Sequence, residues 1–291
     1  MEFIQQVING LALGSVYALL ALGYTMVYGI IQLINFAHGE IYMIGAFAGF
    51  YSATTLKLPL LPTLLIAMAA SALAGIIIEK IAYKPLRNSP RITLLITAIG
   101  VSLLLQNGMR ILVGSDPKPF PDLINAGAIN IGSIQIQWKT ILMFVVSALL
   151  VIVLQFIVYK TKMGKAMRAA SQDMEAASLM GINVNNTISF TFALGSALAG
   201  IAGVLVAISY PSITPYIGVM PGLKSFVAAV LGGIGSIPGA LIGGILIGVL
   251  ETLSKAYIST SFSDAIVFGI LILILLVKPS GLLGKKANVK V

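Results

Sequence analysis

The chain contains no cysteine and a single histidine, His38, among its 291 residues. The absence of cysteine excludes disulfides, thiolate metal ligands and cysteine nucleophiles. One histidine likewise gives no basis for a histidine-rich metal cluster. Charged residues are scarce as well, at 9% of the chain, against roughly 25% in an ordinary soluble domain. A water-soluble globule of this length would therefore expose larger apolar patches than soluble monomers tolerate.

Enzyme motifs are missing too. The sequence has no GxxxxGKS/T phosphate-binding loop, no HExxH zinc motif and no GxSxG nucleophile elbow. We therefore expect no enzyme activity of its own and no cofactor. His38 and Glu40 stand two positions apart, a spacing that puts them on different faces of a helix. This spacing argues against a shared catalytic or metal site.

Long apolar blocks take the place of these features. Hydrophobic residues make up 58% of the chain, and the mean hydropathy is +1.02. A bilayer core about 30 Å thick takes about 20 apolar residues per helix. The uncharged blocks cover 3–37, 41–56, 58–78, 92–109, 140–159, 176–223, 225–250 and 265–277.

These blocks predict an all-α fold. Backbone groups in lipid must be paired within the protein, and the period-two alternation of a β-barrel is absent, so the blocks are expected to be helices. The prediction is a polytopic transmembrane bundle of about 8–10 segments, some of them broken. Residues 1–291 are expected to form a single transmembrane domain.

The basic residues are concentrated between the blocks. The formal net charge is +9 at pH 7, and the segments 79–91, 160–175 and 278–291 carry the whole excess. By the positive-inside rule all three segments face the cytoplasm, so the charge reports membrane topology. It does not indicate a nucleic-acid partner, which would need a basic face. The loop 110–139 is then expected on the opposite side of the membrane.

Residues 213–250 are too long for one crossing. A single helix there would also leave the basic tail on the wrong side of the membrane. Gly235 and Pro238 supply a turn that divides the stretch into two pieces, near 213–232 and 238–256. With two pieces, the tail returns to the cytoplasm.

The first block, 3–37, is also longer than one span. As a continuous helix it would reach roughly 52 Å at 1.5 Å per residue. We therefore expect a break around Tyr28–Gly29. The second piece would then carry Gln32, Asn35 and His38 to a membrane boundary.

Polar side chains near this boundary are candidates for a translocation path. Asn35, His38 and Glu40 fall within nine residues and need partners if they are buried. They form either a structural cap at the cytoplasmic surface or part of a gate. Gln106 and Asn107, near the end of the block 92–109, are similar but weaker candidates.

Glycines are frequent in the second half of the chain. Seven of them fall within 231–249, and Gly232, Gly233 and Gly235 are candidates for a mobile gate. Generic helix packing is the alternative, because close backbone approach through small residues supplies contact energy in lipid. Such residues recur at four-residue spacing in the pairs Gly10/Gly14 and Gly244/Gly248.

The loop around 160–186 contains a predicted short helix, within 165–180. Ser171 or Asp173 is suited to cap it, and Gly181 to end it. A short helix with small residues on one side suits insertion into a groove of a soluble partner. A surface helix on the lipid headgroups is the alternative.

The same loop carries a known motif. Residues 175–181, EAASLMG, resemble the EAAxxxG coupling motif of ABC importer permeases. Together with 34–40 (INFAHGE) and 232–239 (GGIGSIPG), they make the whole chain similar to the LivH-type permease subunits of branched-chain amino acid ABC importers. The resemblance implies that the loop couples to an ATPase through Glu175, Ala176, Ala177 and Gly181.

The resemblance also implies partners and a location. Such permeases pair with a second, LivM-like permease subunit, two cytoplasmic ATP-binding subunits and an extracytoplasmic solute-binding protein. They lie in the lipid of the bacterial cytoplasmic (inner) membrane and cross it several times. ATP binding would close the ATPase pair, shift the coupling helix and reorient the bundle.

Two other functions stay open. Closely related permeases belong to urea and short-amide importers. A stand-alone secondary transporter or channel would favour charges at mid-membrane, whereas Lys224, Glu251 and Asp264 are expected outside the membrane or near its edge. An ion pair of Lys224 and Glu251 at mid-bilayer would favour the stand-alone carrier function.

Overall fold

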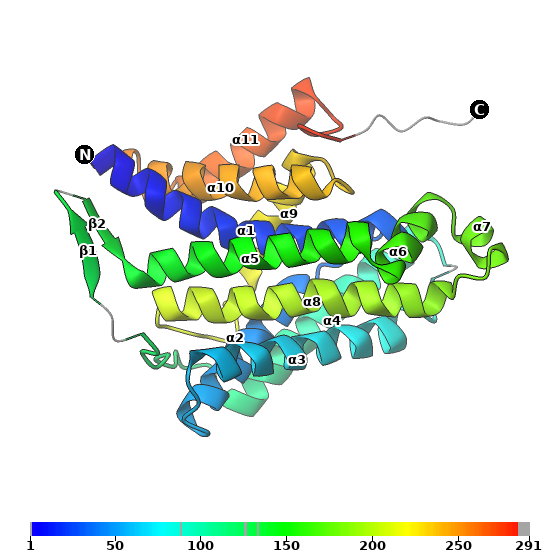
Figure 1. Ribbon diagram of the computed structural model, residues 1–291, viewed down its shortest axis with the longest axis horizontal. Coiled ribbons are helices and arrows are strands. Elements are labelled where there is room, and N and C mark those ends of the chain that lie inside the picture. Colours follow the sequence, from blue (N-terminus) through cyan, green and yellow to red (C-terminus); the bar gives the residue numbers. More distant parts are fainter. Residues whose placement is uncertain (1, 88, 125–126, 133, 285–291) are drawn as a thin grey trace.

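The chain folds into an elongated helical bundle (Figure 1). A computed structural model describes residues 2–87, 89–124, 127–132 and 134–284. The elements are α1 (Glu2–Ile31), α2 (His38–Thr54), α3 (Leu60–Ile78), the π-helix η1 (Glu79–Tyr83), α4 (Arg91–Val113), β1 (Ala128–Ile131), β2 (Ile134–Gln137), α5 (Trp138–Lys160), α6 (Lys162–Gln172), α7 (Met174–Leu179), α8 (Val184–Ser209), α9 (Val219–Gly232), α10 (Ile237–Tyr257) and α11 (Ser263–Val277). The end of the basic tail, with Lys285, Lys286 and Lys290, lies outside the described residues.

The two ends of the bundle carry different elements (Figure 1). The β1–β2 hairpin and the start of α1 lie at one end, the hairpin end, where Gln5 Oε1 accepts a hydrogen bond from the Gln135 backbone N at 2.9 Å. Helices α6 and α7 lie at the other, the α7 end. The antiparallel hairpin, with Ala128 opposite Gln137, was not expected. The alternating run Ile134–Gln137, IQIQ, is the one sequence signal for it.

The helices confirm the predicted class of fold. In the described part of the chain, six are long and apolar enough to cross a membrane: Glu2–Ile31, Leu60–Tyr83, Ile92–Val113, Trp138–Lys160, Val184–Ser209 and Ile237–Tyr257. Helices α9 and α11 are shorter and apolar, and α2 has 17 residues. The chain is therefore an all-α membrane bundle with several short segments.

The core is built on α1 and α8, whose middle turns are almost wholly buried. Glycine allows α1 to approach α10 closely: a Cβ at Gly14 would lie 2.7 Å from Cα of Ile245, and one at Gly10 would lie 2.7 Å from Cα of Val249. The four-residue glycine spacing thus marks a backbone contact, as predicted. Helix α4 differs, because most of its apolar side chains face away from the bundle.

The break in the first block lies later than expected. Helix α1 continues through Tyr28–Gly29 to Ile31, and the chain turns at Gln32, whose φ of 55° ends the helix. The prediction assumed that the helix ends at the membrane edge. Instead, α1 extends past the core at the hairpin end, where residues 2–4 are exposed. The turn covers 32–37, so His38 starts α2.

The division of 213–250 into two pieces is correct. Gly233 and Gly235, with φ of 103° and 91°, form the turn between α9 and α10. Ser236 caps α10, since its Oγ accepts a hydrogen bond from the Gly239 N at 3.2 Å. The first piece begins at Val219 instead of 213, because Ile213 forms a β-bridge with Lys118.

Candidate functional site

The turn between α1 and α2 is fixed by Asn35. Its Oδ1 accepts hydrogen bonds from the backbone N of Ala37 at 3.1 Å and from the Tyr83 hydroxyl at 2.7 Å. Tyr83 belongs to η1, so one buried amide ties this turn to the end of the third helix. Asn35 therefore stabilises the turn before α2, and no described side chain caps that helix.

His38 and Glu40 point toward different neighbours. The His38 ring stands edge-on to Tyr24, with ring centroids 4.7 Å apart. Glu40 faces α4 and is 2% exposed. Its Oε1 accepts a hydrogen bond from Ser102 Oγ at 3.2 Å, whereas its Oε2 has no hydrogen-bond partner among the described residues. As their spacing predicts, the two groups do not share a site.

A cavity of about 280 Å³ lies beside Glu40, between α1, α2, α4 and α9. Its volume is near the lower end of small-molecule pockets, roughly 300–1,000 Å³. The wall is largely apolar, and Phe36, Ile99, Leu103 and Leu223 contribute to it. The Glu40 carboxylate therefore faces a space with few other polar side chains.

This cavity lies halfway along α4. Ser102, which donates to Glu40, is eleven positions after Arg91 and eleven before Val113, the two ends of that helix. If α4 crosses the bilayer, Glu40 is near its centre. A buried ionisable residue at that depth is costly and marks a functional site.

Two helices begin at the cavity. Gly39 lies in the first turn of α2, and Gly218 directly precedes α9. The backbones touch, since a Cβ at Gly39 would lie 2.5 Å from the Gly218 carbonyl oxygen and 3.2 Å from Cα of Gly222. Side chains at these positions would separate the two helix starts. The glycines of 218–222 therefore permit close contact between the two helix starts.

The remaining candidates lie in different places. Gln106 lines the cavity with Glu40, but Asn107 is exposed and its Nδ2 donates to the Leu103 carbonyl of its own helix at 2.9 Å. Gly232, Gly233 and Gly235 form the turn after α9, where Gly232 packs against Gly239 and Gly233 against Gly284. Gly235 lines a separate cavity of about 320 Å³ shared with α6. The structure therefore does not bring all the predicted residues together.

The EAA motif forms an exposed element at the α7 end. Two short helices stand where one was expected, because Asp173 ends α6 and caps α7: its Oδ1 accepts from the N of Glu175 at 2.9 Å and of Ala176 at 3.0 Å. Ala177 is the buried residue of α7. Gly181 follows with a φ of 82°, which suits the predicted terminator. Leu179 and Met180 are 89% and 83% exposed at the tip.

A second polar network joins the α7 end to η1, and the sequence analysis missed it. Glu79 is fully buried and accepts hydrogen bonds from Arg87 at 2.7 Å and Ser189 Oγ at 2.6 Å. Arg87 also donates to Asn185 Oδ1 at 2.8 Å. The loop after η1 is thereby attached to the first turns of α8, which follow α7. A lone glutamate at the end of the apolar block 58–78 was the available signal.

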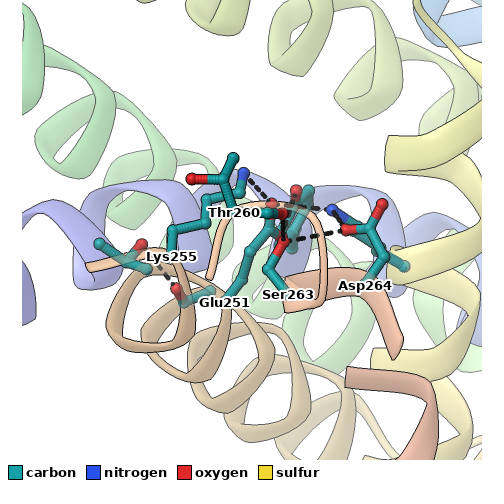
Figure 2. A network of polar contacts seen from close by, with 9 residues as sticks. Glu251, Lys255, Thr260, Ser263 and Asp264 are labelled. Carbon is teal, nitrogen blue, oxygen red and sulfur yellow. Dashed lines mark hydrogen bonds and ion pairs between the residues drawn. The ribbon is translucent and has the colours of Figure 1, made fainter. Parts of the chain in front are cut away.

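An ionic cluster links α9, α10 and α11 (Figure 2). Glu251 Oε1 lies 2.8 Å from Lys224 Nζ and 2.5 Å from Lys255 Nζ, while its Oε2 accepts from the Tyr17 hydroxyl at 2.8 Å. Lys224 also pairs with Asp264 at 2.6 Å. Lys224 and Glu251 are 5% and 1% exposed, so this pair is buried more deeply than expected.

The position of the cluster is nevertheless close to a helix end. Glu251 is six positions before Tyr257, the last residue of α10, or about 9 Å at 1.5 Å per residue. Asp264 lies in the first turn of α11 and its side chain is 40% exposed. Glu251 is also four positions, or about 6 Å, past the midpoint of α10, so the pair lies between the middle and the end of that helix.

Two solved structures have a similar fold. PsaBC from Streptococcus pneumoniae, in complex with Fab, superposes with a TM-score of 0.52 at 15% identity, over 96% of this chain and 93% of that one. An inward-facing metal-chelate type ABC transporter gives 0.51 at 17% identity, over 94% and 87%. At these identities the likeness concerns the fold alone. The chain therefore shares its fold with a protein named as an ABC transporter.

Sequence relatives then place the chain within a family. Residues 6–275 match the family described as branched-chain amino acid transport system / permease component. The chain is 46% identical to the high-affinity branched-chain amino acid transport system permease protein LivH of Salmonella typhimurium, over 100% of its own length and 98% of that protein's. It is 44% identical to BraD of Pseudomonas aeruginosa over the same shares. The chain belongs to this family of transport permeases.

Proposed function

We propose that this chain is the permease subunit of an ATP-driven importer for branched-chain amino acids in the bacterial cytoplasmic membrane. The observation that carries the proposal is identity of 44–46% along the whole chain to permeases named for that transport. The single domain forms the translocation path together with a second permease subunit. ATP hydrolysis occurs in other subunits.

The α7 element supports the ATPase assignment. Leu179 and Met180 extend into solvent from a capped helix, and exposed apolar tips of this kind act as anchors in partner grooves. Asp173 and Gly181 fix both ends of that helix, so the tip is presented rigidly. Two cytoplasmic ATP-binding subunits are the proposed partners, one for each permease.

The remaining partners lie elsewhere on the bundle. Helix α4 exposes Ile96, Leu104, Ile111 and Leu112, an apolar face suited to a second, LivM-like permease subunit or to lipid. The hairpin end is proposed to receive the solute-binding protein. This orientation follows from the positive-inside rule, because the basic residues of α6 put the α7 end in the cytoplasm.

Purification from the host membrane, followed by uptake measurements in proteoliposomes, tests this function. ATPase subunits should co-purify with the chain, and the assembly with its binding protein should import radiolabelled leucine when ATP is present. Unlabelled isoleucine and valine should compete, whereas urea should not. Competition by urea without competition by valine would assign the chain to amide import instead.

A further inference from the structure

We propose that the Glu40 cavity is a transit site for a zwitterionic amino acid, an inference that rests on the proposed function. Glu40 Oε2 receives the ammonium group of the substrate, the start of α9 receives its carboxylate, and the apolar wall holds its side chain. Three independent features of the cavity match the three parts of such a ligand.

The first feature is an unsatisfied carboxylate oxygen. Glu40 is 2% exposed, and Oε2 has no hydrogen-bond partner in the described part of the chain. None of the described residues that line the cavity is a lysine, arginine or histidine, so none of them supplies a cation to this oxygen. A buried charge without a partner is expensive. An incoming ammonium supplies both the charge and the hydrogen bond that are missing.

The second feature is the start of α9, which meets the start of α2 at the cavity. Gly39 and Gly218, at the beginnings of α2 and α9, both line the cavity. The amino end of a helix carries a partial positive charge and favours an anion. The first turn of α2 contains Glu40, which offsets that charge, whereas the first turn of α9 contains no acidic residue. In membrane transporters, half-length helices whose amino ends meet at mid-membrane favour the carboxylate of a substrate.

The third feature is the apolar wall. Ile99 and Leu103 of α4, Leu223 of α9 and Phe36 of the α1–α2 turn face the same space of about 280 Å³. A branched aliphatic side chain buries its surface there without leaving a polar group unpaired. A charged or amide side chain would lose its hydration with few polar groups to replace water.

The absence of cysteine gives a direct test. Two single-cysteine variants are made in the complete transporter assembly: Gln106→Cys, at a position that lines the cavity, and Asn107→Cys, at the exposed neighbouring position on α4. The rate of modification by N-ethylmaleimide is measured with and without leucine. Saturating leucine should slow labelling at 106 at least tenfold and leave labelling at 107 unchanged.

Analogues and Glu40 variants identify the contacts. 4-Methylpentanoate, which lacks the ammonium group, and 3-methylbutylamine, which lacks the carboxylate, should protect position 106 at least tenfold less effectively than leucine. Glu40→Gln should raise the leucine concentration for half-protection by roughly tenfold or more, the effect of one charged hydrogen bond. Glu40→Asp should recover part of the protection. If Glu40→Gln fails to assemble, the analogue comparison decides alone.

The outcomes distinguish failure of the site assignment from failure of the proposed function. If the unsubstituted assembly imports leucine but leucine does not slow labelling at 106, the site assignment is overturned and the proposed function stands. Equal protection by leucine and 4-methylpentanoate, or failure to label position 106 in any nucleotide state, also overturns it. If the assembly imports no leucine, the proposed function fails and the site assignment fails with it.

Discussion

Glu251 shows how a single carboxylate can hold several membrane helices together. Its Oε1 contacts the ammonium groups of Lys224 and Lys255, and its Oε2 accepts the Tyr17 hydroxyl. Residues of α1, α9 and α10 therefore meet at one side chain that is 1% exposed. Near a helix end, such a cluster is best explained as an anchor that fixes α9 and α10 on the core.

Replacing Glu251 by glutamine should destabilise the protein by about 3 kcal/mol, because Lys224 stays buried with only the half-exposed Asp264 as a charged partner. Lys255→Ala is the matched control. The Lys255 side chain is 41% exposed, so its loss should cost no more than about 1 kcal/mol. Thermal unfolding of the detergent-solubilised chain measures both changes. Equal losses in the two variants would contradict the anchoring role.

The partners of Glu40 illustrate what the sequence does not predict at this scale. A glutamate between two apolar blocks was sufficient to single out Glu40. Ser102 is 62 positions away and lies in an ordinary apolar helix, so no local pattern connects the two. Leu223 also lines the cavity beside Glu40, and no local sequence pattern connects these two residues either. Such contacts depend on how the helices pack, and hydrophobic periodicity does not encode packing.

At the scale of elements, the sequence predicted helices and turns well where a chemical signal existed. Gly235 and Pro238 correctly indicated the turn between α9 and α10, and Asp173 and Gly181 the ends of α7. The break in the first block was misplaced because helix length was taken from bilayer thickness alone. Helix α1 is longer, since its first turns continue beyond the buried core.

Helix α7 supports a prediction on coupling. Leu179→Asp should reduce co-purification of the ATPase subunits at least about tenfold, the cost of one interface hot spot, because a charge would replace an exposed apolar anchor. Gln172→Asp, on an exposed residue at the end of α6, is the control and should leave co-purification unchanged. Both variants should insert into the membrane normally.

The backbone and charge of the motif should matter as well. Gly181→Val forces a β-branched residue into a φ of 82°, at a cost of about 1–3 kcal/mol, and should misplace the tip. Glu175→Lys reverses a charge in the first turn of α7. Both should abolish docking and transport. Unchanged uptake together with unchanged co-purification would remove the coupling assignment.

At the scale of the molecule, the two ends of the bundle are chemically distinct. Basic α6 and the exposed tip of α7 mark one end, and the β1–β2 hairpin marks the other (Figure 1). Charge distribution alone predicted which segments lie on the same side. The charge distribution gave no indication of the Glu79 network that connects α8 to η1. Ser189 and Arg87 are far apart in the sequence and belong to no recognisable motif.

Labelling of single cysteines tests the orientation. Gln172→Cys, at the α7 end, should react with an impermeant thiol reagent only from the cytoplasm, and Asn130→Cys, in the hairpin, only from outside. Both positions are exposed, so lack of reaction from one side reports the membrane barrier. Reaction of position 172 from outside in intact cells would contradict the topology.

The dependence of transport on a partner that hydrolyses ATP is tested most directly by uptake into proteoliposomes. One set contains this chain alone, and the other contains the complete assembly with its binding protein. Leucine should accumulate only in the second set, and only while ATP is hydrolysed. Rapid leucine flux through liposomes that hold this chain alone, without nucleotide, would contradict the permease function proposed for it.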